Sequence, residues 1–353
     1  MSVAHLPAGT VVEAKPVDLP DFAHRYMNLA ADDAGARVVA CSDEFFAAAQ
    51  RCLQTSAPLF IAGKFDDHGK WMDGWETKRR RRGGHDHAII QLACRGRIYG
   101  LDIDTSHFTG NFPPAASVDA CDSAGAPDAL TEWTQIVAPM PLSGDSHHFV
   151  ALPTDDRAWT HLRLNIYPDG GVARFRVYGQ PAINWAEQDT SQLHEVSGLH
   201  LGGRVVAWSN AHYGTPSRIL LPGRGVNMGD GWETRRRRDP GFDWCIIALA
   251  HPVEVEKIEI DTAHFKGNYP DRVSAHGGWA QADSTEALVA QAMFWPELLP
   301  EQPTQMHHQH IYQGQINRSV GVVNHVRVNM FPDGGISRVR IWGRLSTDCP
   351  PWE

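Results

Sequence analysis

Hydrophobic and polar residues alternate in several short stretches of the chain. Residues 163–166 (Arg-Leu-Asn-Ile) and 174–179 (Arg-Phe-Arg-Val-Tyr-Gly) both do so, and Pro-Asp-Gly-Gly lies between them at 168–171. Alternation with a period of two predicts half-buried strands, and the turn residues predict that the two strands form a hairpin. The pattern recurs near the C-terminus, where we expect the inward face to carry Val326, Val328, Val339 and Ile341.

Other stretches of the same kind predict further strands. Residues 100–104 and 258–261 alternate and then run into polar loops, whereas helical periodicity is confined to residues 43–53 and 283–293. Many short strands separated by turn residues are typical of a β-sandwich, most simply a jelly roll. The sequence therefore predicts an all-β fold.

The chain also repeats itself. Three long motifs of the first half return in the second: 74–81 at 231–238, 104–111 at 261–268, and 161–171 at 325–335. A period as long as a whole domain indicates tandem domains, not a solenoid. We expect four segments: an N-terminal tail (1–20), a first jelly-roll repeat (21–182), a linker (183–196) and a second jelly-roll repeat (197–353).

Length and charge narrow the function classes. The chain has 353 residues, and its 41 acidic and 32 basic residues give a formal net charge of −9. This balance excludes a general polyanion binder, so we expect neither nucleic acid nor a membrane as a partner. No stretch has the roughly 18 apolar residues of a membrane span, and the N-terminus lacks the apolar core of a signal peptide.

The spacing of the cysteines indicates a cellular compartment. The six cysteines have neither a CxxC pair nor a disulfide-framework spacing: Cys41, Cys52, Cys94, Cys121, Cys245 and Cys349. Such scattered residues are typical of reduced thiols, and we expect a cytoplasmic protein.

One doubled motif, Gly-Trp-Glu-Thr, is followed in each half by at least four basic residues. If the run is a strand, Glu233, Arg235 and Arg237 lie on one side of it. Because an arginine fork matches a carboxylate, we expect an anionic substrate to be bound by Arg80, Arg82, Arg235 and Arg237. The alternative is a solvated or interface strand with weak ion pairs.

The second doubled motif, Asp-Thr-(Ser/Ala)-His-Phe-x-Gly-Asn, begins where a predicted strand ends. An imidazole at His107 or His264 can act as a general acid or base near neutral pH, oriented by Asp104 or Asp261. Asn111 and Asn268 each offer a donor and an acceptor. The alternative is structural: the aspartate caps its own loop and the histidine bonds to the backbone.

Histidine clusters raise the question of a metal. His147 and His148, and likewise His308 and His310, are weak candidate ligands, because a third ligand cannot be assigned. The cofactor therefore stays unknown, with a divalent metal as a candidate that nothing in the sequence requires. Metalloprotease, serine-hydrolase, P-loop and dinucleotide motifs are absent from the sequence.

On these two doubled motifs and the Pro-Asp-Gly-Gly turns, the sequence resembles the allantoicase family. The resemblance covers all but the first twenty or so residues. It implies a tandem jelly roll akin to galactose-binding-like sandwiches and an oligomeric hydrolase acting on carbon–nitrogen bonds in linear amidines. The reaction implied is hydrolysis of allantoate to ureidoglycolate and urea in allantoin degradation.

The chemistry of allantoate suggests roles for the candidate residues. Allantoate carries a carboxylate and two ureido arms on one carbon, so its cleavage needs an anchor for the carboxylate, a proton for the departing urea and a base for water. We expect the arginines to be the anchor and the asparagines to recognise ureido groups. The proton transfers would fall to Glu76 and His107 with Asp104, and to Glu233 and His264 with Asp261.

Several alternatives stay open. A related ureido-hydrolase that acts on ureidoglycolate would share every motif, and a non-catalytic carbohydrate- or ligand-binding module would share the fold. Either repeat, both repeats, or one site built from both, would account for the duplicated residues.

Overall fold

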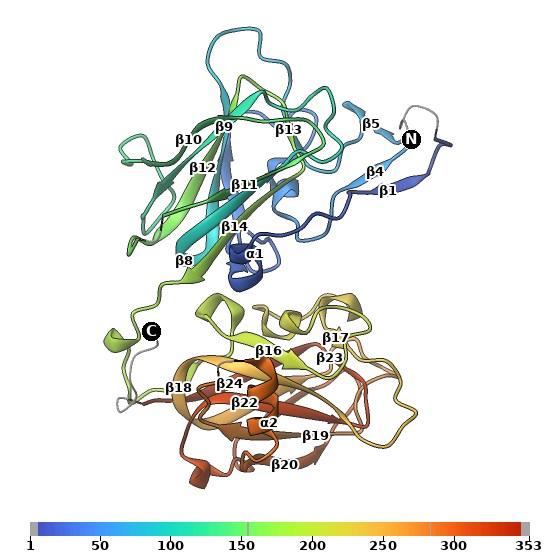
Figure 1. Ribbon diagram of the computed structural model, residues 1–353, viewed down its shortest axis with the longest axis vertical. Helices are drawn as coiled ribbons and strands as arrows, with labels where there is room; N and C mark the ends of the chain where they lie inside the picture. Colours follow the sequence, from blue (N-terminus) through green and yellow to red (C-terminus); the bar gives the residue numbers. More distant parts are fainter. Residues whose placement is uncertain (1–5, 154, 283, 347–353) are drawn as a thin grey trace. The chain divides into compact units, whose positions relative to one another are not determined.

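The computed structural model describes residues 6–153, 155–282 and 284–346. The chain divides between Ile183 and Asn184 into two compact units, which we call unit 1 and unit 2 (Figure 1). The regular secondary structure of both units is almost entirely strand, so the predicted all-β tandem of jelly-roll sandwiches is confirmed.

Unit 1 begins with a strand formed by the predicted N-terminal tail. Its strands are β1 (Val11–Glu13), β2 (Met27–Asn28), β3 (Arg37–Cys41), β4 (Leu59–Ile61), β5 (Phe65–Asp66), β6 (Gly69–Lys70), β7 (Trp75–Glu76), β8 (Asp86–Asp104), β9 (Ala115–Cys121), β10 (Thr134–Pro141), β11 (His147–Ala151), β12 (Trp159–Tyr167), β13 (Gly171–Val172) and β14 (Arg174–Pro181). Its helical segments are α1 (Asp21–Arg25) and the 3₁₀ turn η2 (Ala49–Leu53).

Unit 2 follows the same order with fewer strands at its start. Its strands are β15 (His194–Glu195), β16 (Arg204–Trp208), β17 (Trp232–Glu233), β18 (Asp243–Asp261), β19 (Arg272–Gly278), β20 (Glu297–Pro303), β21 (Gln309–Tyr312), β22 (Val322–Phe331), β23 (Gly335–Ile336) and β24 (Arg338–Leu345). The helical segments are α2 (Thr285–Ala292) and the 3₁₀ turns η3 (Trp185–Glu187), η4 (Leu199–Leu201), η5 (Pro216–Leu220), η6 (Met228–Asp230) and η7 (Arg318–Val320).

One long strand organises each unit. The first half of β8 pairs with β12 and β3, its second half pairs with β14 and β11, and Gly96 is paired at the end of both registers. Ile90 and Leu92 from the first half and Leu101 and Ile103 from the second share one hydrophobic core. In unit 2, β18 pairs in the same way with β22 and β16, and with β24 and β21.

This topology corrects two predictions. The strands around Pro-Asp-Gly-Gly do not form a hairpin, because β12 and β14 pair with different halves of β8. The run of basic residues is not a strand, because β7 ends at Glu76 and β17 ends at Glu233. The strand ends at 100–104 and 258–261 are confirmed, and the four inward residues of the second copy are buried. Of the two helix candidates, 283–293 contains α2, whereas 43–53 contains only η2.

A glycine pair brings distant segments together in each unit. Gly171 of β13 pairs with Glu76 of β7, and its amide donates to the carbonyl oxygen of Asn111 at 2.7 Å. A Cβ atom on Gly171 would overlap the buried ring of Phe108, and one on Gly335 would overlap the ring of Phe265. The doubled His-Phe motif therefore packs directly on the doubled Gly-Gly turn.

We predict that Gly171→Ala lowers the free energy of unfolding by about 1–3 kcal/mol, because a methyl group in this contact overpacks the core. Thermal or urea unfolding measures the change. Gly125→Ala is the matched control, since a Cβ atom there meets nothing within 4 Å. Equal stability of the two variants would contradict this contact.

Candidate active site

The Trp-Glu-Thr motif holds a glutamate between two fixed neighbours. Trp75 is fully buried, and its indole Nε1 donates to the carbonyl oxygen of Asp43 at 2.9 Å. The hydroxyl of Thr77 accepts the amide of Gly170 at 3.1 Å. Trp232 and Thr234 make the equivalent bonds in unit 2. The backbone of Glu76 is thus fixed on both sides while its side chain stays half-buried.

The Asp-Thr-x-His loop is likewise fixed by hydrogen bonds. Asp104 accepts the amide of Ser106 at 2.8 Å, and the hydroxyl of Thr105 donates to the carbonyl oxygen of Ser143 at 2.6 Å. The next residue, His107, has a positive φ of 67°, and His264 has a φ of 71°. A left-handed backbone is uncommon outside glycine and clusters at functional sites.

In unit 1 the two motifs border one pocket of about 340 Å³. This volume lies near the lower end of small-molecule sites, which span about 300–1,000 Å³. Eight residues line it: Phe46, Lys70, Met72, Glu76, His107, Thr109, Gly110 and Asn111. The structure thus brings together three of the predicted site residues of the first repeat, namely Glu76, His107 and Asn111.

The surroundings of Glu76 raise its pKa. The amide Nδ2 of Asn111 donates to its Oε1 at 2.7 Å. Burial raises the pKa of Glu76 from its ordinary value, although the bond from Asn111 and the charge of Lys70 oppose the rise. A carboxylate with a raised pKa is a stronger base than one in water.

The imidazole of His107 is oriented by a backbone carbonyl. Its Nε2 lies 3.2 Å from the carbonyl oxygen of Pro58, which can only accept, so Nε2 carries a hydrogen. Nδ1 is then the ring nitrogen that can exchange a proton with a ligand. The same carbonyl of Pro58 accepts the amide of Ala14, just after β1, at 3.0 Å. The N-terminal segment therefore helps to position the histidine.

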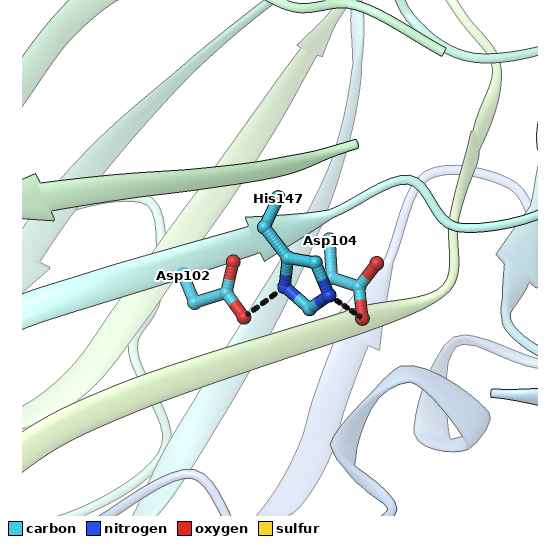
Figure 2. Close-up of side chains that lie close together, drawn as sticks. All are labelled: Asp102, Asp104 and His147. Atoms are coloured by element: carbon cyan, nitrogen blue, oxygen red, sulfur yellow. Dashed lines mark hydrogen bonds and ion pairs between the residues drawn. The ribbon is translucent and has the colours of Figure 1, made fainter. Parts of the chain in front are cut away.

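Asp104 does not orient His107, contrary to the expected pairing. Its carboxylate belongs to a buried cluster in which the imidazole of His147 lies between Asp102 and Asp104 (Figure 2). His147 Nδ1 is 2.9 Å from Asp102, His147 Nε2 is 3.7 Å from Asp104, and Arg176 bonds to both aspartates at 3.0 and 3.2 Å. In unit 2, Asp261 pairs with Arg224 at 2.9 Å, and Nε2 of His264 bonds to the carbonyl oxygen of Gly225 instead.

The structure argues against the metal ligands that the sequence suggested. Both ring nitrogens of His148 are engaged: Nδ1 with the carbonyl oxygen of Ile103 and Nε2 with the amide of Ser143. His310 has the same arrangement with Ile260 and Gln305, and His308 is exposed. His147, Asp102 and Asp104 are close enough to share an ion, but the Arg176 guanidinium already binds the same carboxylate oxygens.

The predicted arginine anchors lie outside the pocket. Arg80 pairs with buried Asp86 at 2.5 Å, and Arg237 lies 3.5 Å from buried Asp243. Their backbone amides bond to Asp169 and Asp333 of the Pro-Asp-Gly-Gly turns. Arg82 and Arg235 are exposed. The doubled basic run is therefore explained in part by ion pairs with buried aspartates.

Unit 2 keeps the Glu–Asn pair in a different pocket. Asn268 donates to Glu233 at 2.5 Å, and a pocket of about 370 Å³ adjoins both residues. Its other lining residues include Thr234, Arg236, Tyr269 and Asp271, and His264 is not among them. The second repeat thus separates its histidine from its Glu–Asn pocket.

Sequence reasoning missed Lys70, the lysine of the unit 1 pocket. It lies on β6, in a stretch between Leu53 and Trp75 that is longer than the stretch between Leu220 and Trp232 of unit 2. Because Lys70 belongs to no repeated motif, self-comparison could not identify it.

A carboxylate, an imidazole, an amide and an ammonium around one small pocket are the groups expected of an enzyme that uses acid–base catalysis on a small polar substrate. The comparisons agree on the family. A sequence model of the allantoicase repeat matches residues 27–182 and 194–346. The chain therefore belongs to the allantoicase family.

Individual relatives support this assignment. A probable allantoicase of Ralstonia nicotianae is 56% identical over 92% of this chain and 97% of its own length, and probable allantoicase 1 of Burkholderia mallei is 55% identical over 92% and 96%. The crystal structure of allantoicase from Saccharomyces cerevisiae matches with a TM-score of 0.73 and 33% identity, covering 90% of this chain and 93% of that chain.

The buried cluster of Figure 2 predicts a pH-dependent stability. Burial alone lowers the pKa of His147, but the bond to Asp102 and the charges of Asp102 and Asp104 outweigh it, so its pKa is raised above 6.5. Protonated His147 then stabilises the fold below about pH 6.5, and this contribution disappears as the pH rises through the raised pKa.

We predict that the melting temperature of wild type exceeds that of His147→Gln most at acid pH, and that the difference shrinks toward about pH 8. Glutamine is the natural comparison, because Gln309 bonds to Glu259 at the equivalent place in unit 2. Melting curves at several pH values measure the difference. A difference that grows with pH would contradict a raised pKa.

Proposed function

We propose that the pocket of unit 1 is where the chain hydrolyses allantoate to ureidoglycolate and urea. The observation that carries this proposal is that Glu76, His107 and Asn111 line one small pocket. A non-catalytic carbohydrate-binding module would have no need of a carboxylate with a raised pKa beside an oriented imidazole.

In this mechanism Glu76 is the general base. One of its oxygens, Oε1, accepts the bond from Asn111, which leaves Oε2 to take a proton from water. The hydroxyl oxygen forms a bond to the central carbon of allantoate. Asn111 also has an amide oxygen that can accept an N–H group of a ureido arm.

His107 is the general acid. Its Nε2 hydrogen is held by Pro58, so proton delivery falls to Nδ1 of the imidazolium. The proton passes to the nitrogen of the departing ureido group as the carbon–nitrogen bond breaks. One water molecule is consumed, urea and ureidoglycolate leave, and proton exchange with solvent restores both residues.

Glu76→Gln and His107→Asn should each lower kcat/KM by about 10²–10⁴-fold, the usual contribution of general acid–base catalysis. Asparagine is chosen because it tolerates the left-handed backbone of His107. Urea release from allantoate measures the loss. Glu233→Gln and His264→Asn are the matched controls in unit 2 and should stay close to wild type. Loss confined to the unit 2 variants would overturn the assignment.

The pH profile gives an independent check. Because the base must be ionised, kcat/KM should fall as the pH drops through the pKa of Glu76, which burial raises above 4.5. The acid limb for allantoate hydrolysis should therefore lie above pH 4.5. Glu233→Gln should keep the same limb. A limb at or below pH 4.5 would argue against Glu76.

We also infer a homo-oligomer in the cytoplasm. Met293 and Phe294, directly after α2, have exposed fractions of 70% and 87%, which favours a covered surface in an assembly. The described cysteines Cys41, Cys52, Cys94, Cys121 and Cys245 are free thiols, as in a reducing compartment, whereas Cys349 lies outside the described residues. No helix among the described residues is long and apolar enough to cross a membrane.

Sedimentation velocity tests the assembly. Phe294→Asp should shift the chain toward a smaller species, because a carboxylate in an apolar contact is costly to bury. Leu130→Asp, at another exposed position (88%), is the control. An unchanged sedimentation coefficient for Phe294→Asp would exclude this surface.

A further inference from the structure

The pocket of unit 1 is lined by one lysine, Lys70. Lys70 is exposed and lines the pocket with Glu76, His107 and Asn111. Among the described residues, no ion pair joins its ammonium to a carboxylate. Lys78, by contrast, pairs with Asp43 at 2.9 Å.

The position of Lys70 is well determined by its neighbours. It pairs with Phe65 in the two-stranded β5–β6 ladder, and its Nζ lies 4.5 Å from the centre of the Phe60 ring. The same ring is 6.1 Å, centre to centre, from the imidazole of His107. One aromatic side chain is therefore in contact range of both the ammonium and the imidazole.

The segment that carries Lys70 is secured at both ends. Strand β4 pairs with β1, and the guanidinium of fully buried Arg174 bonds to the carbonyl oxygen of Ser56 at 2.9 Å and to the carboxylate of Asp73 at 2.8 Å. Phe60 and Met72 pack with Phe108 in a small hydrophobic cluster. The segment that carries Lys70 is therefore held in place beside the pocket.

We propose that Lys70 binds the carboxylate of the substrate; this rests on the proposed function of the pocket. A carboxylate that enters a site already holding ionised Glu76 is repelled unless a cation is close. Among the eight lining residues, Lys70 is the one lysine, and no arginine is present. Of the arginines that the sequence suggested, Arg80 and Arg237 are committed to buried aspartates, and none of the four lines this pocket.

Unit 2 lacks an equivalent lysine at its Glu–Asn pocket. At the position that corresponds to Lys70, counted back from the shared Gly-Trp-Glu motif, the sequence has Asn227, whose side chain caps η6. The next residue, Met228, brings its sulfur to 4.0 Å from Asn268. The unit 2 pocket is bordered instead by Arg236 of the basic run, so a lysine at this position distinguishes the first repeat from the second.

Lys70 also influences the base itself. Burial and the charge of Asp66 raise the pKa of Glu76, and the positive charge of Lys70 opposes both, which helps to keep the carboxylate ionised in the free enzyme. Removing that charge should raise the pKa of Glu76, so the acid limb of kcat/KM should move to higher pH. A lysine that merely shaped the pocket would not move this limb when replaced by a residue of similar length.

The test compares Lys70→Met, Lys70→Arg and wild type. We expect Lys70→Met to lower kcat/KM for allantoate by about 10- to 100-fold, mainly through KM, the size expected for one charge-assisted hydrogen bond. Its acid limb should shift upward, and Lys70→Arg should recover most of both effects. The matched control is Lys64→Met, because Lys64 lies 3.6 Å from the centre of the Trp71 ring and does not line the pocket.

A neutral probe separates the contribution of the substrate carboxylate from that of the ureido groups. Methylenediurea has two ureido groups on one carbon and no carboxylate, so its inhibition constant should be the same for wild type and Lys70→Met. If Lys70→Met weakens methylenediurea as much as allantoate, or changes neither KM nor the acid limb, the proposal is overturned. If Lys70→Met behaves like wild type while Glu76→Gln is inactive, only the role of Lys70 in binding the carboxylate is refuted. If both variants behave like wild type, the proposal that this pocket is the active site is refuted.

Discussion

The close contact between the Gly-Gly turn and the His-Phe loop is the constraint on which the site depends. Only a residue without a side chain fits at Gly171, where Phe108 packs and Asn111 accepts the backbone bond. Gly170 in turn bonds to Thr77, which follows Glu76. Three segments far apart in the chain are thereby joined within a few residues. Their polar side chains meet at one pocket because their backbones meet at one glycine pair.

The two units share this constraint but differ in the loop beside it. In unit 1 the longer loop adds β4 and the β5–β6 ladder, and the N-terminal strand β1 pairs with β4. That loop contributes Lys70 and places the carbonyl of Pro58 against His107. In unit 2 the shorter loop ends in η6 and places Met228 near Asn268. A common scaffold thus carries two chemically different pockets.

Two buried arginines hold loops in place, one in each unit. Arg174 and Arg338 are almost completely buried, and each bonds to the aspartate that precedes the Gly-Trp-Glu motif, Asp73 or Asp230. A buried charge is tolerated only with such partners, and breaking one of these pairs is costly. The same reasoning explains why Arg80 and Arg237, conspicuous in the sequence, are bonded to buried aspartates. Residues of this doubled motif also border pockets, Arg80 a second pocket of unit 1 and Arg236 the pocket of unit 2.

The sequence by itself determined the duplication and the all-β sandwich, because alternation and repeats are local signals that survive without a structure. It also predicted Glu76, His107 and Asn111 as site residues, and these three line one pocket. The tertiary structure alone decided the partner of each side chain. It assigned Asp104 to His147 and Arg176 instead of His107, split the expected hairpin between two halves of β8, and brought Lys70 to the pocket. These contacts join residues distant in the chain, and spacing along a sequence does not specify which distant charges end up within bonding distance.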